Sequence, residues 1–201
     1  MRNFVGAGRM LDRIEILTFE QTGEKEYGWK KQVDSWGQID LQAARSLFST
    51  NGLMAPGVRI CLRKRALRLH QAIRWNGRHC FLTSTKEASR QYLEITAALV
   101  NPVTCRAYRS TTVNDQHNRP QPGEPELIAT FPAVLTEKYL RHSQEEPMSV
   151  VEACYILVTP KAIQLSSGNL VEIAGKRYPV TLCHTLESHK NEYELLREEN
   201  P

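Results

Sequence analysis

The sequence predicts an all-β protein: a small β-barrel followed by a second, diverged barrel-like β domain. Short runs of alternating apolar and polar residues lie between clusters of turn residues, as in half-buried strands. An Asn76-Gly77 pair between two β-favouring runs predicts a two-residue hairpin turn. The same order of signals returns in the C-terminal part of the chain. With 41% hydrophobic residues in a chain of 201, packed cores can form, so disorder throughout is excluded.

The first domain is predicted to span residues 1–109 and to contain about six short strands, a number typical of a small barrel or sandwich. The first two strands form a hairpin with a charged tip, and the last strand ends before Asn101-Pro102. The expected strands cover residues 13–19, 31–41, 58–63, 67–73, 78–83 and 92–99.

A long connection over residues 42–57 interrupts this pattern. A short helix is one interpretation of residues 43–48, and Asn51-Gly52 and Pro56-Gly57 interrupt regular structure. Because long connections are uncommon inside compact β domains unless they serve a function, this segment is the first candidate site.

Residues 110–126 shift to Thr, Asn, Gln, Pro and Gly, which predicts a linker or an extended arm. The second domain is expected to follow over residues 127–201. Aligning residues 73–83 with residues 171–181 matches a strand, a turn glycine, a basic residue and a second strand. A diverged tandem repeat explains this match, and the competing explanation is that small β domains resemble one another at this level.

The two halves of the chain carry opposite charge. Residues 1–110 contain 18 Lys and Arg against 9 Asp and Glu, whereas residues 111–201 contain 8 against 13. This polarity permits an anionic partner for the first half and head-to-tail docking between copies. The simpler interpretation is that both surfaces are only solvated.

No residue pattern predicts catalysis, a metal site or a cofactor. The sequence lacks a nucleophile elbow, a phosphate-binding Gly-rich loop and the paired histidines of zinc peptidases. The group Cys183, His184, Glu187 and His189 has a spacing that matches no zinc module. Five separated cysteines predict buried thiols in a reducing compartment, and the absence of an export signal or a long apolar run predicts a soluble protein.

A basic stretch follows the long connection. Such a stripe can meet backbone phosphates without reading bases, or it can form an ion-paired seam between subunits. Few aromatic residues lie nearby, so a platform for stacking single strands is not expected. The candidate DNA-facing or subunit-facing residues are Arg59, Arg63, Lys64, Arg65 and Arg68.

In their order and spacing, residues 10 to about 105 resemble the head-tail joining family of long-tailed phages, also called head-completion or stopper proteins. The motifs that carry the resemblance are residues 11–16, the hairpin tip at 26–29, the strand 37–41, the loop around Ala44-Arg45-Ser46, the Asn76-Gly77-Arg78 hairpin and the strand 92–95. The loop entry departs from the family, where a Ser-Gly-Arg-Glu-like turn is usual. Members are commonly single domains, and this chain adds a second one.

The resemblance implies a barrel of the head-tail joining type that assembles as a homo-oligomeric ring in the virion neck, after synthesis in the bacterial cytoplasm. Its expected partners are the portal-adaptor complex, the tail terminator or tail tube, and the packaged double-stranded DNA, with no membrane. Its function would be structural, to retain DNA and offer the tail an attachment surface. The resemblance also places the channel-gating loop at residues 42–57, where we single out Arg45, Ser46, Leu47, Phe48, Asn51, Gly52, Pro56 and Gly57.

If both halves are one barrel, six chains would present twelve quasi-equivalent lobes, which favours a sixfold ring over a twelvefold one. The alternative from another class is a nucleic-acid-binding protein of two small barrels that binds without sequence specificity.

Overall fold

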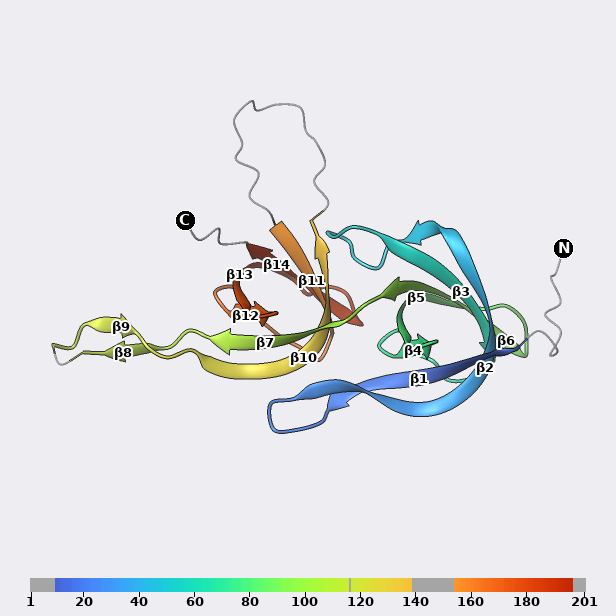
Figure 1. Cartoon of the computed structure of the whole chain (residues 1–201), viewed down its shortest axis with the longest axis horizontal. Helices are drawn as coiled ribbons and strands as arrows, with labels where there is room; N and C mark the ends of the chain where they lie inside the picture. Colours follow the sequence, from blue (N-terminus) through green and yellow to red (C-terminus); the bar gives the residue numbers. More distant parts are fainter. Residues whose placement is uncertain (1–9, 116, 139–153, 197–201) are drawn as a thin grey trace, which may run out of the picture. The chain divides into compact units, whose positions relative to one another are not determined.

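Two closed six-stranded β-barrels make up the computed structural model, which describes residues 10–115, 117–138 and 154–196 (Figure 1). The described residues contain no helix. The chain divides into two compact units, with the main division between Asn101 and Pro102. The all-β fold follows from the period-two burial along the strands, whose inward side chains fill each barrel.

The first barrel is built from six strands in the order β1-β2-β3-β6-β5-β4, closed by β4 pairing with β1. Its core contains branched aliphatic side chains such as Ile14, Ile60 and Ile95, all fully buried. The strands are β1 (Asp12–Gln21), β2 (Tyr27–Ser46), β3 (Ala55–Arg63), β4 (Ala72–Trp75), β5 (Arg78–Glu87) and β6 (Tyr92–Val100).

The second barrel has the order β10-β11-β14-β13-β12-β7, closed by β7 pairing with β10. Phe131 and Tyr193 are its largest fully buried side chains. The strands are β7 (Val103–Arg109), β10 (Glu126–Glu137), β11 (Cys154–Pro160), β12 (Leu170–Ile173), β13 (Lys176–His184) and β14 (Lys190–Leu196). A two-stranded arm, β8 (Thr112–Asn114) and β9 (Pro120–Pro122), extends from the ends of β7 and β10 (Figure 1).

Both barrels share one topology. When β1 to β6 are matched in chain order with β7, β10, β11, β12, β13 and β14, every neighbouring pair in one barrel has its counterpart in the other. The repeated order of sequence signals therefore corresponds to a repeated order of strands.

Two local features repeat as well. The turn between β4 and β5 has φ of 47° at Asn76 and 75° at Gly77, and the turn between β12 and β13 has 51° at Ala174 and 78° at Gly175. Positive φ at both central residues is the type I′ geometry that suits the twist of a hairpin.

The second feature is a bulge at the same place in β5 and β13. Thr83 Oγ1 donates a hydrogen bond to the carbonyl oxygen of Thr96 at 3.0 Å, and Thr181 Oγ1 donates one to that of Glu194 at 3.1 Å. Each threonine lies where the register of its strand shifts against the following one. Thr96 and Glu194 are therefore equivalent positions of β6 and β14.

The domain limits predicted from sequence need correction. The sequence predicts that residues 103–109 belong to the first domain, but they form β7, which pairs with β10 and β12 and supplies the first strand of the second barrel. Residues 110–126 are consequently not a linker between domains; they form an excursion within the second barrel. The strand β7 was missed because its alternating Val, Cys and Ala side chains directly follow the apolar β6, with Asn101-Pro102 as the only break.

The predicted connection 42–57 is also shorter than expected. Residues 43–46 are not helical, because β2 continues to Ser46 and pairs across a bulge with β3 from Ala55 onwards. The connection between β2 and β3 therefore covers only residues 47–54. Its residues 51–53, together with the hairpin tip 21–28, belong to the second compact unit.

Candidate functional site

The connection between β2 and β3 is the candidate functional site, because the resemblance predicts a gating loop there and the structure anchors residues 51–53 through charged side chains. Arg45 and Ser46 lie in the paired end of β2, opposite Pro56 and Ala55 of β3, and their side chains fall outside what the structure describes. Gly57 is likewise a strand residue, opposite Gln42. Half of the predicted gate residues therefore belong to the paired strands β2 and β3 and not to the connection between them.

Within the first unit, the connection begins with a buried anchor. The ring of Phe48 is 3% exposed and meets Phe81 edge to face, with centroids 6.2 Å apart. Such aromatic pairs add to the free energy of burial itself. Leu47 is 60% exposed and points away from that core.

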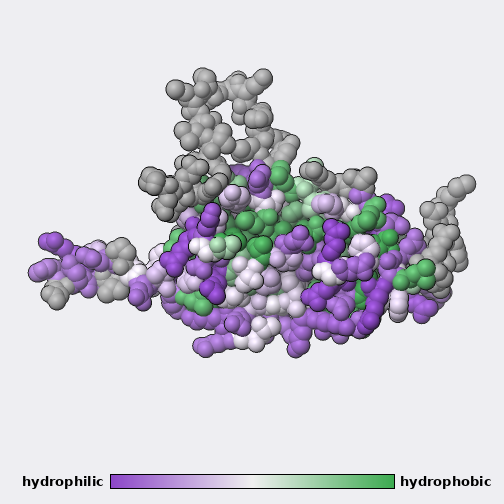
Figure 2. Space-filling view, in the orientation of Figure 1, coloured by the Kyte–Doolittle hydropathy of each residue, from purple (hydrophilic) through white to green (hydrophobic). Residues whose placement is uncertain are grey.

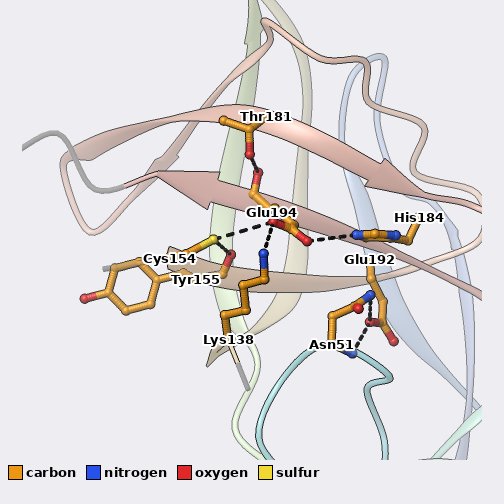
Figure 3. A network of polar contacts seen from close by, with 8 residues as sticks. All are labelled: Asn51, Lys138, Cys154, Tyr155, Thr181, His184, Glu192 and Glu194. Carbon is orange, nitrogen blue, oxygen red and sulfur yellow. Dashed lines mark hydrogen bonds and ion pairs between the residues drawn. The ribbon is translucent and has the colours of Figure 1, made fainter. Parts of the chain in front are cut away.

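Within the second unit, Asn51 is held by a carboxylate of β14. Glu192 Oε2 accepts hydrogen bonds from the backbone N–H of Asn51 at 3.1 Å and from its side-chain Nδ2 at 3.3 Å (Figure 3). Glu192 Oε1 accepts from Lys190 Nζ at 2.7 Å, and both of these side chains are almost fully buried. A buried carboxylate is stable only when charge and hydrogen bonds compensate it, which Lys190 and Asn51 do here.

The next two residues pair with the end of β10. Gly52 forms an antiparallel bridge with Lys138, and the N–H of Leu53 donates to the carbonyl oxygen of Glu137 at 3.0 Å. The same N–H reaches Thr136 Oγ1 at 3.2 Å. Residues 51–53 therefore behave as a short added strand rather than as a free loop.

A second buried carboxylate lies two residues further along β14, so its side chain leaves the same face of the strand. Glu194 is 5% exposed; its Oε2 accepts from Lys138 Nζ at 2.6 Å and its Oε1 lies 3.0 Å from His184 Nε2 (Figure 3). Cys154 Sγ approaches Glu194 Oε2 at 3.8 Å. Lys138 thus belongs both to the bridge with Gly52 and to this charged cluster.

The charges in this cluster stabilise an ion pair between Glu194 and Lys138 rather than prepare a reactive group. Burial would raise the pKa of Glu194, but the hydrogen bonds from Lys138 and His184 outweigh it and keep the pKa below its usual range. The hydrogen bond to Glu194 in turn raises the pKa of Lys138. Both partners therefore stay charged at neutral pH.

The thiol beside them is not activated. Burial and then the charge of Glu194 raise the pKa of Cys154, so the thiol stays protonated at neutral pH. A nucleophilic cysteine needs the opposite, a lowered pKa. His184 and Cys154 both contact the carboxylate rather than each other, so they do not form a nucleophile and base pair.

The other cysteine and histidine set considered from sequence does not converge. Cys183 Sγ lies 3.6 Å from the carbonyl oxygen of Leu165, whereas its neighbour His184 faces Glu194 on the other side of β13. Across the described ranges, no group of three or more His, Cys, Asp or Glu side chains is arranged to hold a metal ion.

The predicted basic residues fall into two groups. Arg59 pairs with Glu94 at 3.5 Å and Lys64 with Glu87 at 2.6 Å. Arg63 and Arg68 form no ion pair with any residue that the structure describes, and Arg65 has a buried Nη1 without a hydrogen-bond partner there. The stripe is therefore partly neutralised by acidic neighbours, which its sequence alone did not indicate.

Sequence reasoning missed Glu192, Glu194 and Lys138. In the sequence, Glu192 and Glu194 alternate with Tyr193 and Leu195, which is the usual pattern of an outward, solvated strand face. Only the three-dimensional position of residues 51–53 shows that Glu192 is covered. The sequence does offer Asn51, whose polar side chain needs a partner once it is half-buried, but nothing in the sequence points to Glu192 as that partner.

No family model and no curated protein matches the chain. Among the residues that the structure describes, no helix has the length and apolar character needed to cross a membrane.

Proposed function

We propose that the chain is a structural head-tail connector of a tailed bacteriophage. In this role it forms a ring below the portal-adaptor complex in the virion neck, retains packaged double-stranded DNA and provides the surface to which the tail attaches. One observation carries the proposal: a small β-barrel whose second and third strands are joined by a connection with a defined anchored state. The order and spacing of motifs over residues 10 to about 105 support the same assignment.

The anchoring gives the proposed gate a physical mechanism. In the anchored state, Asn51 and Leu53 satisfy Glu192 and the end of β10. A gate that swings toward a channel must break these hydrogen bonds and expose the Glu192 carboxylate to water or to a new donor. The two states are discrete because paired strands and buried charges are either satisfied or not.

The repeated barrel suits the ring. Six chains with two equivalent lobes each would match a twelvefold surface on one side and a sixfold one on the other. Opposite charge on the two halves of the chain favours head-to-tail contacts between copies. Arg106 and Arg109 belong to the second barrel, which reduces this contrast without reversing it.

Capsids assembled without the chain test the proposal. We expect filled heads that lose DNA and fail to take tails, and restoration of both properties when the purified chain is added. Heads that keep their DNA and join tails in its absence would refute the proposal.

An Asn51→Ala chain is a sharper probe of the gate. It should still restore tail joining, because the barrels are intact, but retain DNA less well. The matched control is Leu47→Ala, which alters an exposed side chain of the same connection. Equal DNA retention by both variants would show that the anchor does not control the gate.

A non-specific nucleic-acid-binding protein is the second candidate, favoured by the three arginines of the basic stretch that form no ion pair with any described residue, Arg63, Arg65 and Arg68. Binding of duplex DNA by the isolated chain would then weaken steeply with salt, with a slope near −0.9 per phosphate neutralised. The connector proposal predicts only a weak dependence of DNA binding on salt, because Arg59 and Lys64 are already paired with acidic side chains.

A further inference from the structure

The hairpin tip at residues 21–28 pairs with the edge of β10 inside the second unit through one parallel bridge. The N–H of Thr130 donates to the carbonyl oxygen of Lys25 at 2.7 Å, and Glu26 bridges Thr130 in parallel fashion. Lys25 Nζ also donates to the carbonyl oxygen of Leu127 at 2.8 Å. This part of β10 is open to such a partner because β11 pairs with β10 only from Val134 onwards.

The equivalent edge in the first barrel can be located from the registers. Ile95 and Tyr193 directly precede the equivalent residues Thr96 and Glu194 of β6 and β14. In the first barrel, Ile95 lies opposite Ile60 of β3, and Ile60 lies opposite Ile39 of β2. In the second barrel, Tyr193 lies opposite Leu157 of β11, and Leu157 lies opposite Leu135 of β10. Counting back along β2 and β10 from Ile39 and Leu135 makes Asp34 the equivalent of Thr130.

This equivalent edge of β2 carries no added strand. β3 pairs with β2 only from Gly37 onwards, so residues 30–36 have β1 on one side and no strand on the other within the described structure. All of these residues except Ser35 are exposed, including Val33 at 36% and Trp36 at 58%. A hollow of about 400 Å³ lined by Met10, Asp34, Ser35, Trp36 and Arg63 lies beside it. An exposed, unpaired edge with apolar side chains is a template for pairing with another chain.

The segment equivalent to the tip is the arm between β7 and β10. Just as the tip joins β1 to β2, residues 110–125 join β7 to β10, and they are longer. Near the end of the arm, Asp115 Oδ1 accepts hydrogen bonds from the N–H groups of His117 and Arg119, both at 2.8 Å. Its surface is mostly hydrophilic (Figure 2), so pairing through the backbone suits it better than apolar packing.

From this equivalence we infer that the arm of one copy adds a strand to the edge of β2, residues 30–36, in a second copy of the chain. The tip on β10 and the arm on β2 would then be equivalent contacts. The first is made within one chain, and the second is made between two chains. The contact is heterologous, so it propagates from copy to copy and forms a ring when the rotation between successive copies closes. The inference deepens the ring of the proposed connector and rests on that ring for its closure, but the contact itself rests only on the repeat.

Photo-crosslinking on the full chain tests the contact directly. A benzoylphenylalanine replaces His117 at the exposed end of the arm, and the protein is mixed with a ¹⁵N-labelled chain before irradiation. We expect cross-links from the arm to peptides containing residues 30–36, with light arm peptides joined to heavy β2 peptides. Cross-links confined to one chain, or to other regions, or none at all, would overturn the inference.

Two variants measure its strength. In the first, Asn-Gly replaces residues 110–125, so that the paired Arg109 and Glu126 still close the β7–β10 hairpin. In the second, Asp34→Pro removes the edge N–H, with Asp34→Asn as the control that keeps it while losing the same charge; proline is tolerated on an open strand edge. We expect at least tenfold weaker self-association, by sedimentation velocity, for the arm replacement and Asp34→Pro, and less than a threefold change for Asp34→Asn.

The outcomes separate this inference from the connector proposal. Self-association that persists at full strength without the arm would overturn the arm contact and leave the connector standing. Capsids that retain DNA and take tails without the chain would remove the connector and leave the arm contact to be judged by the cross-links.

Discussion

Replacing Glu192 by Gln should destabilise the second barrel strongly, whereas the equivalent Glu94→Gln should barely affect the first. Glu192 and Glu94 occupy matching positions of β14 and β6, one residue before the equivalent pair Tyr193 and Ile95. The Glu192 side chain is 3% exposed and pairs with Lys190, which is 8% exposed. The Glu94 side chain is 43% exposed and pairs with an exposed Arg59.

The magnitudes follow from these environments. Breaking a buried ion pair by replacing one partner costs about 3–5 kcal/mol, and Glu192→Gln removes the charge that pairs with Lys190. An exposed pair contributes about 0–1 kcal/mol. Because 1.4 kcal/mol is tenfold in an equilibrium constant, the two substitutions should differ by about two orders of magnitude in unfolding constant.

Urea unfolding of the full chain measures the change in the free energy of unfolding for each variant. Hydrogen exchange with mass spectrometry, in a separate experiment on the folded protein, shows which barrel is affected. Peptides from residues 154–196 should lose protection in Glu192→Gln, and the amide of Leu53 should exchange faster because its anchored segment is released. Peptides from the first barrel should be unchanged in both variants. Equal losses for the two substitutions would refute the reasoning, since strand position and not coverage by residues 51–53 would then set the cost.

Three further predictions concern single residues. Ala174→Asn should stabilise the second barrel by about 1 kcal/mol in urea unfolding, because Ala at φ 51° carries a left-handed penalty that Asn76 avoids at the equivalent turn. Burial, and then the charge of Arg74, lower the pKa of His79 from 6.5 to about 4. As the pH falls, His79 is therefore protonated in the unfolded state at a higher pH than in the folded state. The free energy of unfolding keeps its full contribution from His79 above pH 6.5 and falls by up to about 3 kcal/mol on acidification to pH 4. Cys154 should alkylate slowly at pH 7, and Glu194→Gln should accelerate it, because the carboxylate contributes to the raised thiol pKa.

Each of these has a result that would contradict it. Unfolding midpoints of Ala174→Asn at or below the wild-type value would mean that the turn is not strained. An unchanged pH profile in His79→Gln would assign the acid sensitivity to another group. Alkylation of Cys154 as fast as that of a small free thiol would mean that it is exposed or activated.

The strands and the hairpin turns could be predicted from sequence because their signals are local. Asn76-Gly77 specifies its turn through its own backbone preferences, and the alternation in residues 13–19 follows from one buried face. The repeat was visible for the same reason, since residues 73–83 and 171–181 carry the same local signals in the same order. The closure of each barrel was not visible, because pairing of β4 with β1 joins segments that are far apart in sequence.

The site was only half predictable. Residues 42–57 stand out as a long break in a β pattern, so their position could be found without a structure. Their anchoring could not, because Glu192 lies 141 residues away from Asn51 and has the sequence pattern of a solvated strand face. The resemblance that suggested a gate describes a single barrel, and it therefore contains no counterpart for Glu192.

A repeat within one chain allows equivalent surfaces to diverge, and the two strand edges next to β2 and β10 illustrate this. On β10 the edge is covered by residues 25 and 26, and its side chains from Ala129 to Ala133 are buried or half-buried. On β2 the matching edge has kept charged side chains, among them Lys31 and Asp34, which pair with each other at 2.7 Å. Charges on an open edge prevent indiscriminate strand addition while leaving the backbone available to a partner that tolerates them. A polar arm with its own ordered turn meets that requirement better than an apolar strand would, so the charges on β2 favour the arm of another copy over random aggregation.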